Sequence, residues 1–405
     1  MLFTLIKNEL IKLLRRGKTW IVFGLFVLFV GLNVFSQYQT DKNTRAYMTI
    51  EYKLSSSKAE LERVNEEIKL VEEDKSVNPE YRNALTQNKE VLENNIKNYE
   101  NMINSGITEE DQWKSNLDTN IAELKAQIEE YSKYDDEWSA KYKEEAQEQL
   151  ETYQYLKDNN IKPLYNWEYQ SYGFLNNLME FLSMAILLCG IAVFMSDIVS
   201  GECTPATLKF LLVQPVTRGK VLLSKFIAVT LTVIAMVIGA EAAGFFFIKL
   251  TSSIDGSDYP VRLHSLYEIT SNGVLSRIPG SGYMASNSEL VIKSLLFQSL
   301  FIFTGCAVVF MISTLIKSSM ITMAVSVIST VFITIASFTI SSLNKINHLI
   351  FVNYANSVNL VTGNLAQSFG NPNMTTNMAL IVMIATSIIA LAVAYISFNK
   401  KDILI

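Results

Sequence analysis

Apolar residues along this 405-residue chain gather into six long runs that alternate with polar segments. Each run approaches or exceeds the roughly 20 residues that a helix needs to cross the hydrocarbon core of a membrane. A helix on the surface of a water-soluble protein would instead have one apolar face and one polar face. We therefore predict an all-α, polytopic membrane protein with six transmembrane helices, which cover residues 19–35, 174–195, 226–248, 291–316, 320–343 and 378–398.

The segment before the first run has a different pattern, in which apolar and basic residues alternate at helical spacing. This pattern is typical of an amphipathic helix that lies in the membrane interface, although a simple extension of the first span is the alternative. Its apolar positions are Leu2, Phe3, Leu5, Ile6, Leu10, Leu13 and Leu14, and its basic positions are Lys7, Lys12 and Arg15. No small-residue cleavage site follows the first run, so we predict an uncleaved anchor and not a signal peptide.

Residues 39–171 form a polar block in which apolar residues recur at alternating steps of three and four. Such heptad seams are buried when helices pair with each other. Asn78-Pro79 and Gly106 interrupt the seams. A helix is expected to begin at Pro79, since Pro suits the first turn, and to end at Gly106, since Gly suits a helix end. Thr108 is expected to cap the next helix. We predict a helical hairpin or coiled-coil bundle between the first and second spans, which divides the chain into 1–38, 39–171 and 172–405.

The formal net charge of −5 is unevenly distributed. Residues 39–171 hold 29 acidic and 17 basic residues, whereas the short segments beside the spans are rich in Lys and Arg. Because cytoplasmic segments of membrane proteins carry the excess of Lys and Arg, we predict cytoplasmic termini, an extracellular block and a location in the plasma membrane. The sequence lacks the basic, aromatic-laced surface that binds nucleic acid, so that class of function is excluded.

Cysteine and histidine offer little chemistry. Cys189, Cys203 and Cys306 lie outside the polar block, and their spacing suits neither a disulfide framework nor a metal site. His264 and His348 are isolated in the sequence. We therefore predict no metal and no catalytic residues in this chain.

A polar segment, residues 197–220, joins the second and third predicted spans. Within it, Pro205 can begin a short helix that Thr204 caps, and Pro215 can end it. Leu208, Leu211 and Leu212 would share one face of this helix. A short amphipathic helix held between two spans can move both spans when a partner docks against it.

In this segment the chain resembles the type-2 ABC transporter permease family. The residues that match the motif of the family are Glu202, Thr207, Leu208, Lys209, Leu211, Leu212, Pro215, Val216, Thr217, Arg218, Ser224 and Lys225. Ala206 stands where the family usually has Gly, which is a small departure. The interfacial N-terminal helix, the six spans and the chain end 398–403 also resemble the family. A plain amphipathic loop without a partner is the alternative interpretation.

The resemblance implies that Glu202, Thr207, Leu208, Lys209, Leu211, Leu212, Pro215 and Arg218 contact a groove of a cytoplasmic ATP-binding subunit. No Gly-x-x-x-x-Gly-Lys-(Ser/Thr) motif occurs in the sequence, so ATP and Mg are expected on that partner and the chain is not expected to be an enzyme. A second permease subunit, identical or different, and membrane lipids are the other expected partners. Residues 344–377 are expected to form a short helical hairpin in the outer leaflet.

Two carboxylates lie within the apolar runs, Glu180 in the second and Glu241 in the third. A carboxylate costs about 2.5–3.5 kcal/mol at the middle of a membrane and less towards its surface. One interpretation makes them part of a polar path for a cationic or zwitterionic substrate. The other makes them structural residues that bond to neighbours such as Asn177 or Gln298.

The function that these observations favour is that of the membrane-spanning permease of an ATP-driven exporter. Its substrate would be amphipathic or membrane-associated, such as a peptide, an antibiotic or a lipid-linked molecule. The alternative is a non-transporting envelope scaffold or receptor with an extracellular coiled coil, similar to the phage-infection-protein family. An intramembrane enzyme is a third possibility, but no arrangement of catalytic residues in the sequence supports it.

Overall fold

The computed structural model describes residues 2–73, 78–106, 113–134, 136–202, 217–270 and 273–400. It divides into two compact units. We call Met1–Phe35 together with Tyr169–Ile405 the membrane unit, and Ser36–Glu168 the hairpin unit. The described part contains five helices that are long and apolar enough to cross a membrane, and six spans if one bent pair is counted as a span. The predicted all-α, polytopic membrane fold is confirmed.

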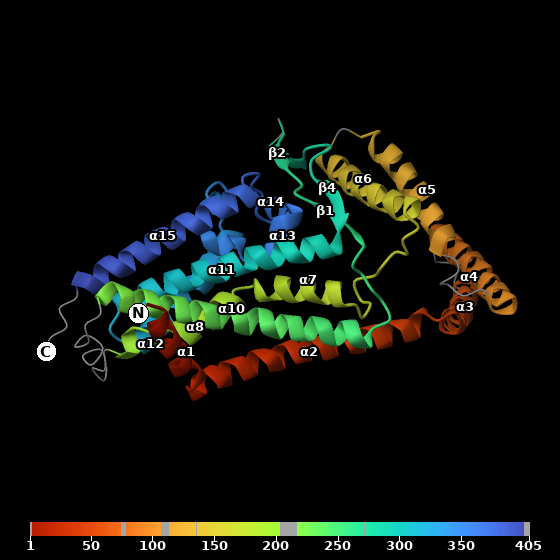
Figure 1. Ribbon diagram of the computed structural model, residues 1–405. Helices are drawn as coiled ribbons and strands as arrows, with labels where there is room; N and C mark the ends of the chain where they lie inside the picture. Colours follow the sequence, from red (N-terminus) through yellow and green to blue (C-terminus); the bar gives the residue numbers. More distant parts are fainter. Residues whose placement is uncertain are drawn as a thin grey trace. The chain divides into compact units, whose positions relative to one another are not determined.

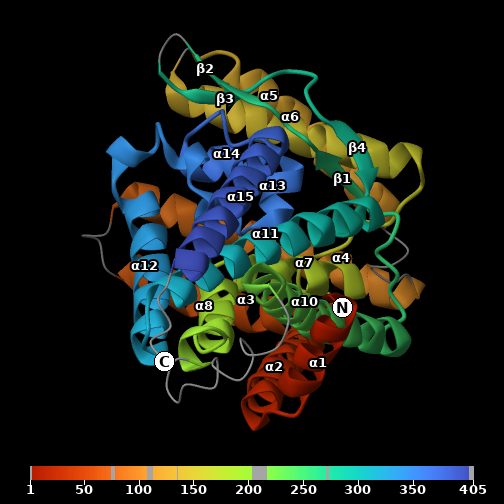
Figure 2. The ribbon, with the colours of Figure 1, turned by 60° about the vertical axis from the view of Figure 1, so that its left-hand side comes forward.

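The membrane unit is built around α11, which contacts α7, α8, α10, α12 and α15 (Figures 1 and 2). Helix α1 packs against α10, and α2 begins in this unit and continues into the hairpin unit. The helices are α1 (Leu2–Leu14), α2 (Gly17–Met48), α7 (Ser171–Leu182), α8 (Ile186–Met195), α10 (Arg218–Thr251), α11 (Asn287–Leu315), α12 (Ser319–Thr339) and α15 (Thr376–Lys400). A 3₁₀ helix, η1 (Ser200–Glu202), follows α8.

The second span, predicted over residues 174–195, is not one continuous helix. Helices α7 and α8 meet at an angle of 66°. Ala185, between them, has a φ of 68°, a left-handed conformation that stops an α-helix. The Ser183 hydroxyl donates to the Glu180 carbonyl (2.6 Å), which satisfies one acceptor at the end of α7. The span is therefore broken without a glycine or proline at the break.

Two connections of the membrane unit contain further structure. Between α10 and α11, β1 (Pro260–Leu263) pairs antiparallel with β4 (Tyr283–Ser286), and β2 (Tyr267–Ile269) pairs with β3 (Leu275–Arg277). The sequence shows no clear signal for these strands. Between α12 and α15 lie η2 (Ser341–Leu343), η3 (Asn347–Leu349), η4 (Phe351–Tyr354), α13 (Ser357–Thr362) and α14 (Asn364–Phe369).

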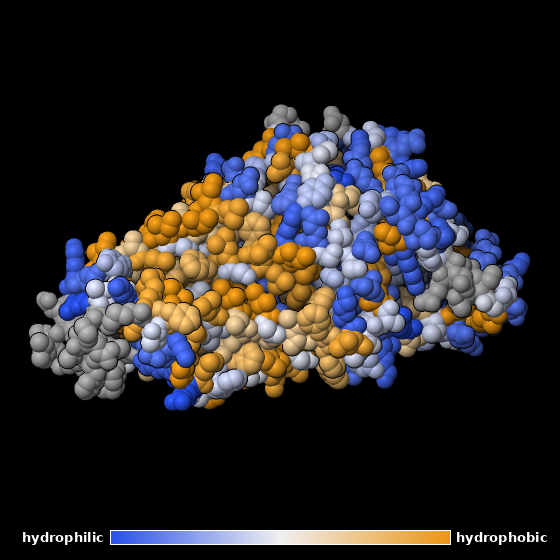
Figure 3. Space-filling view, viewed as in Figure 1, coloured by the Kyte–Doolittle hydropathy of each residue, from blue (hydrophilic) through white to orange (hydrophobic). Residues whose placement is uncertain are grey.

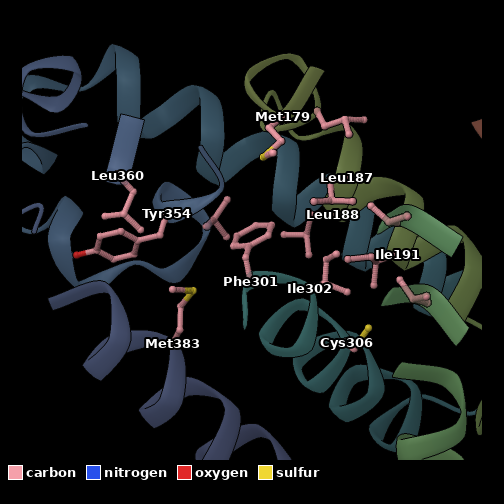
Figure 4. Packing of buried hydrophobic residues seen from close by; sticks show 14 of the residues in the cluster. Met179, Leu187, Leu188, Ile191, Phe301, Ile302, Cys306, Tyr354, Leu360 and Met383 are labelled. Atoms are coloured by element: carbon pink, nitrogen blue, oxygen red, sulfur yellow. The ribbon is translucent and has the colours of Figure 1, made fainter. Parts of the chain in front are cut away.

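The core of the membrane unit lies on both sides of α11 (Figure 4). Phe301, Ile302 and Cys306 of α11 are almost wholly buried. Ile302 and Cys306 lie near Leu188 and Ile191 of α8 (Figure 4). On the other side of α11, the core continues with Tyr354, Leu360 and Met383, from η4, α13 and α15. The remaining outer surface of these helices is largely apolar (Figure 3), as expected for helices that face lipid.

The hairpin unit contains two helix pairs with hydrophilic outer surfaces (Figure 3). Helix α3 (Ile50–Glu73) packs against α4 (Pro79–Ser105), and α5 (Trp113–Tyr131) packs against α6 (Glu137–Asp158). The predicted helix start at Pro79 and end at Gly106 are confirmed, because Asn78 caps α4 and Gly106 ends it with a φ of 65°. The predicted cap Thr108 lies outside the described residues.

Candidate functional site

Most of the predicted partner-contact loop falls in residues 203–216, outside the part of the chain that the structure describes. That gap contains the predicted helix with Thr207, Leu208, Lys209, Leu211, Leu212 and Pro215. The structure places the two ends of the loop. Glu202 ends η1, and Arg218 begins α10.

The segment that leads into the loop is fixed to the corner between α1 and α2. Asp197 accepts a hydrogen bond from the Lys18 ammonium (2.9 Å) and forms an ion pair with Arg16 (3.6 Å). These side chains are about one-third exposed, so solvent weakens the attraction, but two cations share one carboxylate. Asp197 therefore links the end of α8 to the start of α2.

The same segment is also fixed to α11 through Ser313. The backbone N–H groups of Val199 and Ser200 both donate to the buried Ser313 hydroxyl, at 3.3 and 3.2 Å. That hydroxyl also lies 3.2 Å from the Ser196 carbonyl, to which it donates. Buried backbone groups need such partners, because an unmade hydrogen bond costs about 1–3 kcal/mol. The turn before the loop is thus held by one side chain from a distant span.

The segment that follows the loop is tied to α15 and α1. Arg218 donates to the carbonyl of Asn399, near the end of α15 (3.5 Å). Two turns later, the Lys225 ammonium lies 3.1 Å from the Glu9 carboxylate of α1. Lys225 is only 3% exposed and Glu9 15%, so this pair is shielded from water. The two ends of the loop therefore contact α1, α2, α11 and α15.

The residues that fix the loop ends were not predicted from the sequence. Lys225 was matched only as part of the family motif, and Glu9 and Ser313 were not singled out. A charged residue at the start of an apolar run was a usable signal for Lys225, since such a residue needs a partner. The serine offered none, because hydroxyl groups are common in these spans.

The two predicted path carboxylates have different surroundings. Glu241 is fully buried between α10 and α11, and its Oε1 accepts from Gln298 Nε2 (2.7 Å). Its Oε2 has no hydrogen-bond partner among the described residues, nor has Gln298 Oε1 or the Ser294 hydroxyl. Glu180 in α7 is half-buried, and no hydrogen bond or ion pair between described residues joins it to Glu241. The Gln298 contact agrees with a structural role for Glu241, although three polar atoms at this site have no hydrogen-bond partner among the described residues.

At the other end of the membrane unit, the β1–β2 connection is latched to α13 through the backbone. The N–H groups of His264 and Ser265 donate to the carbonyls of Val361 and Thr362, at 2.8 and 2.9 Å. Gly363, with a φ of 95°, follows directly, and a Cβ there would lie 2.2 Å from the Ser265 carbonyl oxygen. We call these contacts the backbone latch. The pKa of His264 is lowered by burial and then by the nearby Lys293 ammonium.

Among the described residues, no group of three or more His, Cys, Asp or Glu side chains is placed to hold a metal ion. The family comparison is decisive, however. Residues 3–403 match the model of the ABC-2 family transporter protein. None of the curated proteins gives a significant match. Since the match covers nearly the whole chain, this protein belongs to the ABC-2 transporter family and is the membrane permease of an ABC transporter.

Proposed function

We propose that the chain is the membrane-spanning subunit of an ATP-driven exporter, and that a separate cytoplasmic subunit binds and hydrolyses ATP with Mg. The observation that carries this proposal is the fixing of both loop ends to four helices. Asp197 and Ser313 hold the end before residues 203–216, and Arg218 and Lys225 hold the end after them. A partner seated on the loop would therefore act on several spans at once.

The contacts of Arg218 and Lys225 could transmit movement of α10 to α15 and α1. Shielded pairs such as Lys225–Glu9 resist separation, because parting them leaves a charge in surroundings that cannot solvate it. A displacement of the first turns of α10 would therefore carry α1 along. The contact of Arg218 with the end of α15 adds the last span. In this proposal Glu202, Arg218 and the six loop residues between them contact the ATPase.

The proposed orientation places both termini and residues 197–220 in the cytoplasm and residues 39–171 outside the cell. It is supported by Lys and Arg at the ends of the spans, among them Lys7, Lys12 and Lys400. A complete transporter would contain two permease subunits, identical or different, and two ATPases.

We further propose an amphipathic or membrane-associated substrate, such as a peptide, an antibiotic or a lipid-linked molecule. Glu241, whose Oε2 has no hydrogen-bond partner among the described residues, and Glu180 are the polar residues that a cationic group on the substrate would meet within the spans. On the hairpin unit, Trp138 is 69% exposed and stacks on Tyr142, which also stacks on Tyr131. Exposed stacked aromatics are suited to bind the apolar part of such a molecule.

The test is purification of the tagged full-length protein from its native host under mild detergent. We expect a cytoplasmic protein with a P-loop to copurify, and substrate transport by the reconstituted complex to require ATP. Glu202→Ala combined with Arg218→Ala should reduce both the amount of bound ATPase and the transport per ATP hydrolysed.

Lys317→Ala is the matched control, because Lys317 is an exposed basic residue in the α11–α12 connection on the same proposed side. It should leave assembly and transport unchanged. Unaltered assembly and transport in the Glu202/Arg218 double variant would contradict the role of this loop. Copurification without a P-loop protein would instead favour the envelope scaffold.

A further inference from the structure

A groove of about 500 Å³ lies between the beginning of α10 and the last turns of α15, and Phe310 of α11 also lines it. The two helix ends lie on the same side of the membrane unit (Figure 1) and are joined by the Arg218–Asn399 contact. Most of the lining is apolar: Leu222, Leu223, Phe226, Leu391, Ala392 and Ala394. The polar lining, Thr217 and Lys220, lies at the end where α10 begins.

The groove is long enough to hold part of an acyl chain. Its lining residues on α10 run from Thr217 to Phe226, and a helix rises about 13 Å over that segment. The walls belong to helices that are long and apolar enough to span a membrane, so the apolar part of the groove faces acyl chains and not water. A cytoplasmic protein could reach only its polar end.

At the mouth of the groove, Gly219 of α10 lies against the ring of Tyr395 of α15. A Cβ at Gly219 would lie 2.6 Å from the Tyr395 ring, so any larger residue would displace that ring. Tyr395, itself 52% exposed, therefore forms the side of the groove at the level of Lys220. An aromatic side chain at this level is typical of the membrane–water interface.

The charge at the mouth of the groove is positive. Arg218 and Lys220 lie in the first turn of α10, and Lys400 ends α15. Helix α15 contains no acidic residue, and α10 contains none before Glu241. Basic side chains above an apolar groove are complementary to an anionic headgroup above an acyl chain.

We propose that this groove binds an anionic phospholipid, with the phosphate at Lys220 and an acyl chain along Leu222, Leu391 and Ala392. The site goes beyond the transport function proposed above; only its assignment to the inner leaflet rests on the proposed orientation. The lipid fills the space between the helix that follows the contact loop and the last span. The lipid composition of the membrane would therefore affect the packing of α10 against α15, the two helices that the Arg218–Asn399 contact joins.

The test uses the purified full-length protein in detergent, to which phosphatidylglycerol or phosphatidylcholine with identical chains is added. Binding is measured by native mass spectrometry. We expect phosphatidylglycerol to bind about tenfold more tightly than phosphatidylcholine, and Lys220→Gln to remove most of that preference, as expected for one lost charged contact. Ala392→Trp should abolish retention of both lipids at this site, because the indole obstructs the path of the acyl chain beside Leu391.

Two controls match these variants. Ala385→Trp places the same indole on an exposed face of α15 seven residues earlier, outside the groove, and Lys317→Gln removes an exposed basic residue outside the groove. Both should bind lipid like the unaltered protein. Glycerol 1-phosphate should not compete, which distinguishes a lipid from a free phosphate.

Equal binding of the two lipids by the unaltered protein, full competition by glycerol 1-phosphate, or full phosphatidylglycerol binding by Ala392→Trp would overturn the proposal. If Ala392→Trp does not fold, the Lys220→Gln result decides alone, because an exposed Lys→Gln change preserves the fold. Copurification of an ATPase is a separate measurement, so failure of either proposal is recognised independently.

Discussion

Each unit of the molecule holds two helices together with a lysine–carboxylate pair, and the two pairs differ mainly in their surroundings. In the membrane unit, Lys225 of α10 lies 3.1 Å from Glu9 of α1, with side chains 3% and 15% exposed. In the hairpin unit, Lys157 of α6 lies 2.6 Å from Asp118 of α5, with both side chains 55% exposed. The shorter contact is therefore the one that water surrounds.

The distance between the charged groups alone does not determine how much an ion pair contributes to stability. Attraction at a given distance is several times stronger where water is excluded, but so is the cost of removing one partner. An exposed pair competes with water and salt and contributes little. We therefore expect the stability of the hairpin unit to depend on its buried apolar seams. The stability of the membrane unit should depend on keeping both partners of its buried polar contacts.

The largest effect is expected from Lys225→Met. The change leaves Glu9 in a shielded position without its cation, and removal of one partner from a buried pair costs about 3–5 kcal/mol. The purified protein should lose hydrogen-exchange protection in α1 and α10. The double variant Glu9→Gln/Lys225→Met is the control and should recover most of the protection; a double variant as unstable as the single one would contradict the argument.

A somewhat smaller effect is expected from Leu117→Ala in the hairpin unit. Leu117 is 1% exposed in the α5–α6 seam, and truncation of such a residue costs about 2–4 kcal/mol. Hydrogen exchange should accelerate in α5 and α6 and not in α10. Leu70→Ala, at a position that is 68% exposed, should have little effect. Similar losses for both variants would mean that the seam does not stabilise the unit.

Gly106→Ala tests a local contribution to the same unit. No atom of the described residues lies within 4 Å of the added Cβ, so we expect the cost to arise from the left-handed backbone and to amount to about 1–2 kcal/mol. Exchange should accelerate in the last turn of α4. Gly24→Ala, inside helix α2 and also with open space around it, should show no loss. A loss at Gly24 and none at Gly106 would refute the conformational explanation.

The smallest effect is expected from Lys157→Met, which removes the exposed pair. The pKa of Lys157 is raised by its hydrogen bond to Asp118 and by the attraction of that carboxylate. A lysine whose pKa is higher in the folded than in the unfolded protein contributes to stability. The contribution is complete below about pH 10.4, the pKa of lysine in an unfolded chain, and is lost as the pH rises through the pKa of the folded state. Thermal melts followed by circular dichroism at pH 8 should scarcely change. A large decrease in the melting temperature would show that this exposed pair behaves like a buried one.

Much of the fold could be predicted from the sequence because strong periodic patterns decide it. Apolar runs located the spans, and Pro79 and Gly106 located the limits of α4. The break at Ala185 escaped prediction, since its residues also favour a continuous helix. The short strands between α10 and α11 also escaped, because three or four residues carry too little periodicity.

Of the candidate site, only the part encoded by residues close together in the sequence could be predicted. The motif predicted the partner-contact loop. Gln298 was one of two neighbours named for Glu180 and Glu241, and its hydrogen bond to Glu241 confirms it for that carboxylate. Pairs such as Lys225–Glu9, 216 residues apart, depend on how helices pack and leave little trace in the sequence. The six loop residues between Glu202 and Arg218 remain a prediction.

The backbone latch between the β1–β2 connection and α13 has a consequence for sequence variation. Its two hydrogen bonds join main-chain groups, so replacement of the side chains at positions 264 and 265 leaves both donors in place. Gly363 is different, because any side chain there would collide with the Ser265 carbonyl. A saturation mutagenesis screen should therefore detect this tertiary contact mainly as intolerance at a single codon, that of Gly363.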